Sequence, residues 1–135
     1  MAEIVNIKRA CEKHLAALVP SVVTAYEGVN FEPPSNAMYQ RCQFTISPPD
    51  DPVFGTGYHR ERVQFQVFVV DPLGQGTTNA LQRAELIRQH FAKGTTLVEG
   101  STPLYVLTTP QIAGTSVSQG KVIVPVLIDL VAEVY

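Results

Sequence analysis

The chain has 135 residues, of which 45% are apolar and only 16% charged, and its formal net charge is −2 at pH 7. This length supports one hydrophobic core, so we expect a single domain over residues 1–135. The basic residues are scattered and slightly outnumbered by acidic ones, which excludes the basic surface that tight nucleic-acid binding requires. No apolar run approaches the roughly 18 residues of a membrane span, and the N-terminus lacks the order of a signal peptide, so we expect synthesis in the cytoplasm.

Apolar residues near the N-terminus recur at helical spacing. They are Ile4, Ile7, Cys11, Leu15 and Leu18. A helix from Ala2 to Leu18 is therefore predicted, ending before Pro20 because the residue that precedes a proline avoids the helical region. The apolar run 22–26 predicts a short strand. Residues 29–36 contain two prolines, which cannot donate to a sheet ladder, so this segment is predicted to be a loop.

Two alternating segments predict the next strands. In residues 39–47, Cys42, Phe44 and Ile46 share one face, as a half-buried strand requires. A surface excursion rich in proline, aspartate and glycine follows. Residues 58–70 then alternate in the same way, except that Phe68 and Val70 interrupt the polar face. Apolar side chains on both faces indicate that this end of the strand is covered on one face by the fold itself and on the other face by something else.

A second helix is predicted from 77–79 to Phe91, with Asn79 as its cap, answered by Gln82. A strand at 104–109, a flexible segment at 113–120 and a final strand at 121–134 follow, the two strands pairing as an antiparallel hairpin. The predicted fold class is α+β, a mixed and mainly antiparallel β-sheet of about five strands flanked by two α-helices.

The final strand is apolar on both faces, and Pro125 inside it predicts a bulge or an edge position. An open apolar edge promotes aggregation, so we expect another subunit to cover it. Cys11 and Cys42 fall on apolar faces and are expected to be reduced core residues, without a disulfide.

No motif predicts catalysis, a cofactor or a metal. The segment Gly74–Asn79 follows a strand and opens a helix, but Asn79 stands where the third glycine of a dinucleotide-binding motif belongs. Cys11 and His14 are one helical turn apart, yet zinc needs further ligands. The loose set Ser47, Asp50 and His59 has no recognised catalytic geometry. We therefore expect no enzyme activity.

Several segments resemble a family of small phage and prophage proteins that is similar in fold to the tail terminator proteins of long-tailed bacteriophages. These segments are Tyr26–Pro34, Tyr39–Cys42, Arg62–Val70 with its GxG loop, and Phe91–Leu97. The resemblance implies a mixed sheet with two flanking helices, assembled into a hexameric ring that caps the tail tube and joins it to the head, without catalytic residues or cofactors.

The implied partners are further copies of the chain, the tail tube protein and a head completion or connector protein, with no membrane. DNA would pass through the ring without specific binding, and the mild acidity fits a channel that does not hold phosphates. The implied location is the tail–head junction of the virion, and the host cytoplasm during assembly.

Candidate contact residues follow from these expectations. For the subunit interface we predict the second faces of the two long strands, at Phe68, Val70, Ile123, Leu127 and Val131. The alternative is that the second helix packs there. For docking to the tube and the head we predict residues in or beside three loops, with Phe31 and Tyr58 as aromatic anchors. The docking residues are Phe31, Glu32, Tyr39, Asp50, Asp51, Tyr58 and Ser116.

Two other functions stay open. One is a small nucleotide- or metabolite-binding domain that uses the Gly74–Gly76 loop, which would be monomeric and stabilised by its ligand. The other is a different head–tail or tail-tube component.

Overall fold

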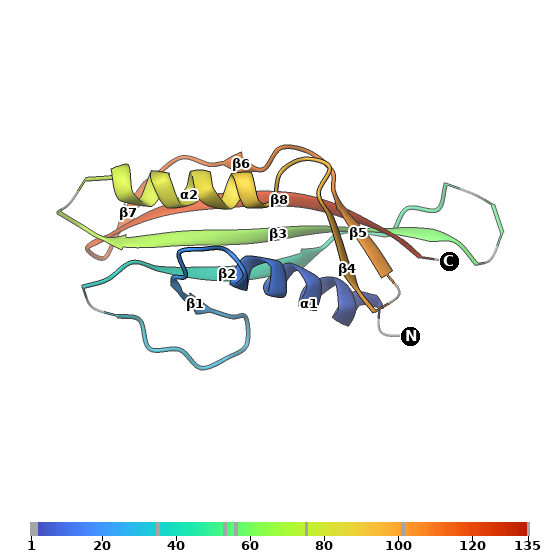
Figure 1. Ribbon diagram of the computed structural model, residues 1–135, viewed down its shortest axis with the longest axis horizontal. Helices are drawn as coiled ribbons and strands as arrows, with labels where there is room; N and C mark the ends of the chain where they lie inside the picture. The colour runs from blue at the N-terminus through green and yellow to red at the C-terminus, as the bar shows by residue number, and fades with distance from the viewer. Residues whose placement is uncertain are drawn as a thin grey trace.

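The computed structural model describes residues 3–34, 36–52, 54–55, 57–74, 76–100 and 102–134. Ala2, where the first helix was predicted to begin, and Gln75 of the glycine loop lie outside these residues. One long mixed sheet forms a layer, and both helices lie on the same face of it (Figure 1). The predicted α+β class is confirmed. The predicted strand number is wrong, because the described residues form an eight-stranded sheet.

The elements follow the predicted order with three additions. The helices are α1 (Glu3–Ala16) and α2 (Thr78–His90). The long strands are β2 (Tyr39–Ile46), β3 (His59–Pro72) and β8 (Lys121–Val134). The short strands are β1 (Val23–Ala25), β4 (Thr96–Glu99), β5 (Thr102–Val106), β6 (Gln111–Ile112) and β7 (Ser116–Ser118). β4, β6 and β7 were missed because two to four residues carry too little alternation to read.

The strand order is β1-β2-β3-β8-β5-β4, with β6 and β7 also paired to β8. Every pairing is antiparallel except that of β1 with β2. β3 and β8 pair over their full length, from His59 opposite Val134 to Pro72 opposite Lys121. The predicted hairpin is correct in its antiparallel pairing of β5 with β8, but β6 and β7 intervene. The tight turn joins β7 to β8, where Gln119 and Gly120 both have positive φ.

Pro125 does not mark an edge or interrupt the ladder with β3, so the predicted bulge or edge position is wrong. β8 lies between β3 and β5, and Pro125 stands opposite Phe68 in an unbroken register. The Pro125 carbonyl accepts a hydrogen bond from the Ala113 N–H at 2.9 Å. In an antiparallel strand, the backbone N–H and C=O of any one residue point toward the same neighbouring strand. The missing N–H of Pro125 therefore faces the β6–β7 side and costs the β3 ladder nothing.

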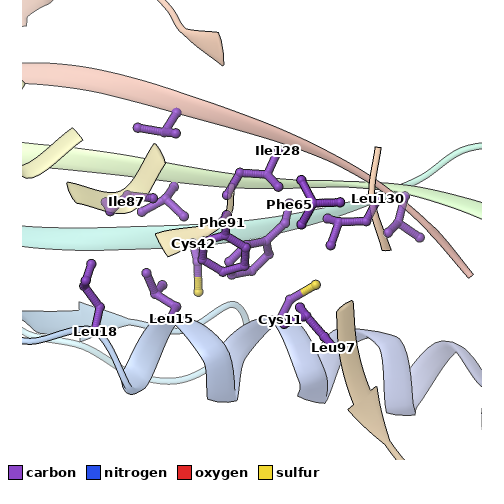
Figure 2. Packing of buried hydrophobic residues seen from close by; sticks show 14 of the residues in the cluster. Cys11, Leu15, Leu18, Cys42, Phe65, Ile87, Phe91, Leu97, Ile128 and Leu130 are labelled. Atoms are coloured by element: carbon purple, nitrogen blue, oxygen red, sulfur yellow. The ribbon is translucent and has the colours of Figure 1, made fainter. Parts of the chain in front are cut away.

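The hydrophobic core fills the space between the two helices and one face of the sheet (Figure 2). α1 contributes Cys11 and Leu15, and α2 contributes Ile87, followed by Phe91 at its end. The Phe91 ring packs against the Phe65 ring, with centroids 5.8 Å apart. The core face of the sheet comes from alternate residues of β3 and β8, as the sequence periodicity predicted. These residues are Val63, Phe65, Val67 and Val69 with Val122, Val124, Val126, Ile128 and Leu130.

The two helices contact each other through their last turns. The His14 and His90 rings stack 3.9 Å apart, and each Nε2 donates to the backbone carbonyl of the other histidine, at 2.7 Å and 2.5 Å. The last four carbonyls of a helix have no partner within it, and this reciprocal pair satisfies one of them at each of the two ends. The predicted Asn79 cap is wrong: Asn79 lies inside α2, and Thr77, at the N-cap, makes no side-chain capping bond.

A buried polar network attaches the segment before β2 to α2. Arg83 is only 4% exposed, and its Nε donates to Gln40 Oε1 at 3.1 Å. Its Nη1 donates to the Pro20 carbonyl at 2.5 Å, and Gln40 Nε2 donates to Thr24 Oγ1 at 3.0 Å. Buried polar groups are stable only when paired, so this network fixes where β1 joins the sheet.

Replacing Phe91 with alanine tests the core. The ring is fully buried against Phe65, so Phe91→Ala should lower the free energy of unfolding by roughly 3–5 kcal/mol, measured by denaturant titration. The control is Val98→Ala on β4, where the side chain is 65% exposed and the change should stay within about 0.5 kcal/mol. A loss below about 1 kcal/mol for Phe91→Ala would contradict the packing.

The two thiols should be unreactive in the folded protein. Both cysteines are buried and free, and burial raises the pKa of Cys11 to about 12 and that of Cys42 to about 11. An ordinary thiol reacts readily at pH 8 because part of it is thiolate. We expect no native labelling by a thiol reagent at pH 8 and complete labelling in denaturant. The thiol introduced by Ser116→Cys on exposed β7 should react at once, and native labelling of Cys11 or Cys42 at that rate would refute the burial.

Candidate functional site

Both helices of the described residues pack on one face of the sheet, and we call the opposite face the open sheet face. It comprises Arg41, Gln43, Gln64, Gln66, Phe68, Ile123, Leu127 and Asp129, which alternate with the core residues of the same strands. α2 packs on the opposite face, against Phe65 and its neighbours, so the alternative that the second helix covers Phe68 is wrong.

The five predicted interface residues fall into two groups. Phe68, Ile123 and Leu127 are half-buried, so each keeps apolar surface on the open sheet face. Val70 and Val131 are already buried within the monomer, at 2% and 9% exposure. Their cross-strand neighbours are Tyr39 and Tyr105, and aromatic side chains cover much of an adjacent valine.

Polar side chains surround the apolar residues of the open sheet face. The Arg41 guanidinium lies 4.9 Å from the centre of the Phe68 ring. Gln64 Nε2 donates to Asp129 Oδ1 at 3.0 Å, and Gln66 Nε2 donates to Gln64 Oε1 at 2.6 Å. Apolar side chains inside a polar frame are typical of a surface that contacts another protein.

The predicted docking residues lie in two groups at opposite ends of the sheet. Phe31, Glu32 and Tyr39 lie near the end of the sheet where β3 finishes, as does Ser116. Asp50, Asp51 and Tyr58 lie at the other end, where β2 leads into β3 (Figure 1). The β3 strand that separates the groups has 14 residues, or about 45 Å of extended chain. The chain therefore presents loop surface to two places far apart.

Both predicted aromatic anchors make contacts within the monomer. The Phe31 ring packs against the Tyr39 ring, with centroids 5.4 Å apart. The Tyr58 hydroxyl donates to Glu133 Oε1 at 3.0 Å and accepts from Arg60 Nη2 at 3.3 Å. Asp50 lies 3.8 Å from Arg60, whereas Glu32, Asp51 and Ser116 are exposed.

Phe54 is the exposed aromatic residue that sequence reasoning missed. It lies in residues 47–58, which we call the arm, and its side chain is fully exposed. The base of the arm extends the β2–β3 hairpin through the hydrogen bond from the Ser47 N–H to the Arg62 carbonyl and two bonds between Asp50 and Arg60. A phenylalanine among prolines, aspartates and glycines has no local core to enter, and that composition was the signal available in the sequence.

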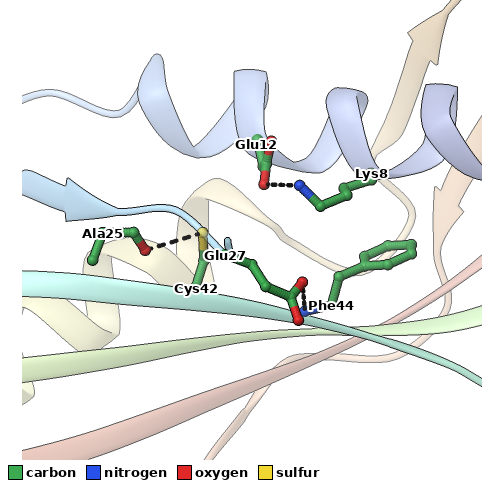
Figure 3. Close-up of polar contacts among 6 residues, drawn as sticks. All are labelled: Lys8, Glu12, Ala25, Glu27, Cys42 and Phe44. Carbon is green, nitrogen blue, oxygen red and sulfur yellow. Dashed lines mark hydrogen bonds and ion pairs between the residues drawn. The ribbon is translucent and has the colours of Figure 1, made fainter. Parts of the chain in front are cut away.

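A groove of about 390 Å³ lies between α1 and the segment that follows β1, and we call it the α1 groove. Its lining residues are Lys8, Arg9, Glu12, Lys13, Ala16, Tyr26, Glu27 and Val29. Lys8 Nζ pairs with Glu12 Oε2 at 2.7 Å, and Glu27 Oε1 accepts the Phe44 N–H at 3.3 Å (Figure 3). The pairing of β1 with β2 ends at Arg41, so the Phe44 N–H has no partner in β1, and Glu27 accepts its hydrogen bond instead.

The structure does not assemble the candidate catalytic and metal residues. Cys11 faces the core while His14 stacks on His90. His59 Nε2 lies 2.9 Å from Glu61, and Asp50 pairs with Arg60 instead. Within the described ranges, no three His, Cys, Asp or Glu side chains are placed to share a metal ion. The helices of the same residues are too short and too polar to span a membrane.

The Gly74–Gly76 loop has the geometry of a turn. Gly74 and Gly76 have φ of 108° and 76°, a region that favours glycine because it lacks a Cβ. Asp71, just before the loop, is 5% exposed, and burial raises the pKa of its carboxyl group. Gly74 and Gly76 lie between the end of β3 and the start of α2, where the chain reverses direction (Figure 1).

Residues 6–129 match the family of phage tail terminator proteins. Solved structures with the same fold include the following two. The first carries no functional name and has a TM-score of 0.76 and 23% sequence identity, over 100% of this chain and 97% of that chain. The second belongs to the virion of a native gene transfer agent particle, with a TM-score of 0.63 and 19% identity over 98% of both chains. Curated protein sequences show no significant match.

The family match spans nearly the whole sheet and both helices. The described residues of this fold offer an open sheet face and two distant loop groups. The chain belongs to the phage tail terminator family and has a structural role in the phage tail.

Proposed function

We propose that this protein forms a hexameric ring that caps the tail tube and connects it to the head. The observation that carries the proposal is the open sheet face, where Phe68, Ile123 and Leu127 are only half-buried, in a chain of the tail terminator family. Only 16% of the residues are charged, where a soluble domain averages about 25%, so the apolar part of the open sheet face has few charges around it. Contact with further copies of the chain would cover this surface.

The subunit contact uses the open sheet face. Phe68, Ile123 and Leu127 touch the neighbouring copy, and Arg41 and Gln66 frame the contact with polar groups. Val70 and Val131 support the strands from within and take little part in the contact, because the monomer already buries them. A ring requires two different surfaces of each copy to meet, so a second surface must accept the open sheet face.

The two loop groups serve the two axial partners. With the long strands running along the ring axis, the group of Phe31, Glu32, Tyr39 and Ser116 faces one partner. The group of Asp50, Asp51 and Tyr58 faces the other. A separation of about 45 Å lets one protein touch a tail tube protein on one side and a head completion or connector protein on the other.

Ring formation is tested by a charge on the open sheet face. Leu127→Lys would place an unpaired ammonium in the contact, so the variant should stay monomeric where the wild type forms six-copy rings, measured by sedimentation velocity and electron microscopy. Leu73→Lys, at an exposed position just after β3 and outside this face, is the matched control and should form rings. Rings of normal size from Leu127→Lys would contradict the contact.

The capping role is tested in the virus. Removal of the coding sequence from the phage or prophage that carries it should leave tails that do not join heads, and supplying the wild-type protein should restore joined particles. Normal tailed particles in its absence would refute the function. The partner bound at the tube end, and the number of copies there, separates a terminator from another head–tail component.

DNA should not bind the protein. A net charge of −2 offers little to neutralise phosphates, and a channel wall that held phosphates would slow DNA passage. We expect no retardation of duplex DNA in a gel-shift assay at physiological ionic strength. Retardation that weakens steeply with added salt would show a basic contact that this account excludes.

A further inference from the structure

We propose that His14 and His90 form an acid-sensitive clasp, which holds the last turns of α1 and α2 together at neutral pH and releases them when both rings are charged. The clasp consists of these two side chains and the two backbone carbonyls that they bind. The inference goes beyond the proposed function and does not depend on ring formation, so the two can fail separately.

The hydrogen bonds of the clasp fix where a proton can be added. Each Nε2 lies within bonding distance of the backbone carbonyl of the other histidine, at 2.7 Å and 2.5 Å. A carbonyl oxygen only accepts, so each Nε2 carries a hydrogen and the neutral ring keeps its free lone pair on Nδ1. Acid therefore adds the next proton at Nδ1 of each ring. Both hydrogen bonds survive this step, and what changes is the charge of the rings.

The stacking of the two rings opposes the addition of both protons. The ring centroids are 3.9 Å apart and the planes are within 11° of parallel. One charged ring is tolerated, because the C-terminal end of a helix favours a positive charge. A second proton would stack two like charges on half-buried side chains, where water screens them weakly. Burial lowers the pKa of His14 and the charge of His90 lowers it further, while the hydrogen bond to His90 raises it.

The described charged groups around the clasp do not neutralise a second charged ring. Glu12 binds Lys8 at 2.7 Å, and Glu99, which lines one hollow with His14, binds Lys13 at 3.0 Å and lies 4.0 Å from Arg9. The strands β5 and β6, which also contact the helices, have no charged residue. The charged side chains within about one helical turn of either histidine, or beside one on β4, are Glu12, Lys13, Arg88, Lys93 and Glu99.

The clasp joins two helices that rest on different strands. α1 packs mainly against β4 and β5, whereas α2 packs mainly against β8 and β3. Both histidine rings also lie edge-on to the Phe91 ring, with centroids 4.7 Å and 5.7 Å from it. Repulsion within the clasp therefore separates the two helix ends and uncovers Phe91, while the pairing of the long strands is unaffected.

The free energy of unfolding, measured by denaturant titration between pH 5 and pH 8, tests the clasp. An unfolded histidine has a pKa of about 6.5 and the folded pKa of His14 is lowered, so the unfolded chain takes up protons first as the pH falls. The contribution of the clasp is complete above about pH 6.5 and is lost below it. We expect the unfolding equilibrium constant of the wild type to rise at least about ten-fold from pH 7 to pH 5. Burial raises the pKa of Asp71, which acts in the opposite direction and is present in every variant.

Glutamine variants separate the clasp from other acid effects. The double variant His14→Gln/His90→Gln keeps an N–H donor at both positions without a charge, so it should lose the acid sensitivity. Each single variant leaves one ring without a charged neighbour ring and should remove more than half of it. His59→Gln is the matched control, because it removes the third histidine of the chain, which binds Glu61, and should keep the acid sensitivity in full. A double variant as acid-sensitive as the wild type would overturn the inference.

Two measurements on the wild type decide the question even where a variant does not fold. Nitrogen NMR should find the hydrogen of both neutral rings on Nε2. Amide hydrogen exchange, corrected for its intrinsic pH dependence, should accelerate at pH 5 in residues 15–18 and 88–91 while β8 stays protected. A hydrogen on Nδ1 of either neutral ring, or helix ends as protected at pH 5 as at pH 7, would overturn the clasp. Neither result bears on ring formation, so the proposed function is tested independently.

Discussion

The rest of the structure depends on the pairing of β3 with β8. Fourteen residues of each strand pair without interruption, and alternation sends one set of side chains to the helices and the other to the open sheet face. The helices cover only one face, so the same ladder that organises the core also displays Phe68 and Leu127 outside it. One side of this ladder packs in the core, and the other side carries the contact that we propose between subunits.

The sequence was informative wherever periodicity was long. The alternation in Lys121–Val134 gave the bounds of β8, and the apolar spacing from Ile4 to Leu15 gave the inner face of α1. It failed where a choice depended on partners distant in the chain. Pro125 predicted an edge strand because a proline cannot donate a hydrogen bond to a neighbouring strand. In the structure, the position of its missing N–H faces Ala113, which lies between the short strands β6 and β7.

The contact residues show the same limit. Apolar residues on both faces of the long strands predicted an apolar surface outside the core. Periodicity could not tell that cross-strand neighbours already bury Val70 and Val131. Nor could it tell that Tyr58 binds Glu133, because that contact joins residues 75 positions apart. Phe54 was not predicted as a contact residue because a loop has no hydrophobic periodicity. Its full exposure is known only from the structure.

In the assembly that we propose, the open sheet face meets a neighbouring copy sideways, and the two loop groups point along the tail. The most direct measurement is the structure of the assembled ring by electron cryomicroscopy. The account predicts Phe68 and Leu127 buried against a neighbouring copy, with the long strands along the ring axis. A ring in which that face is bare on every copy, and the contacts are made by the helices alone, would contradict it.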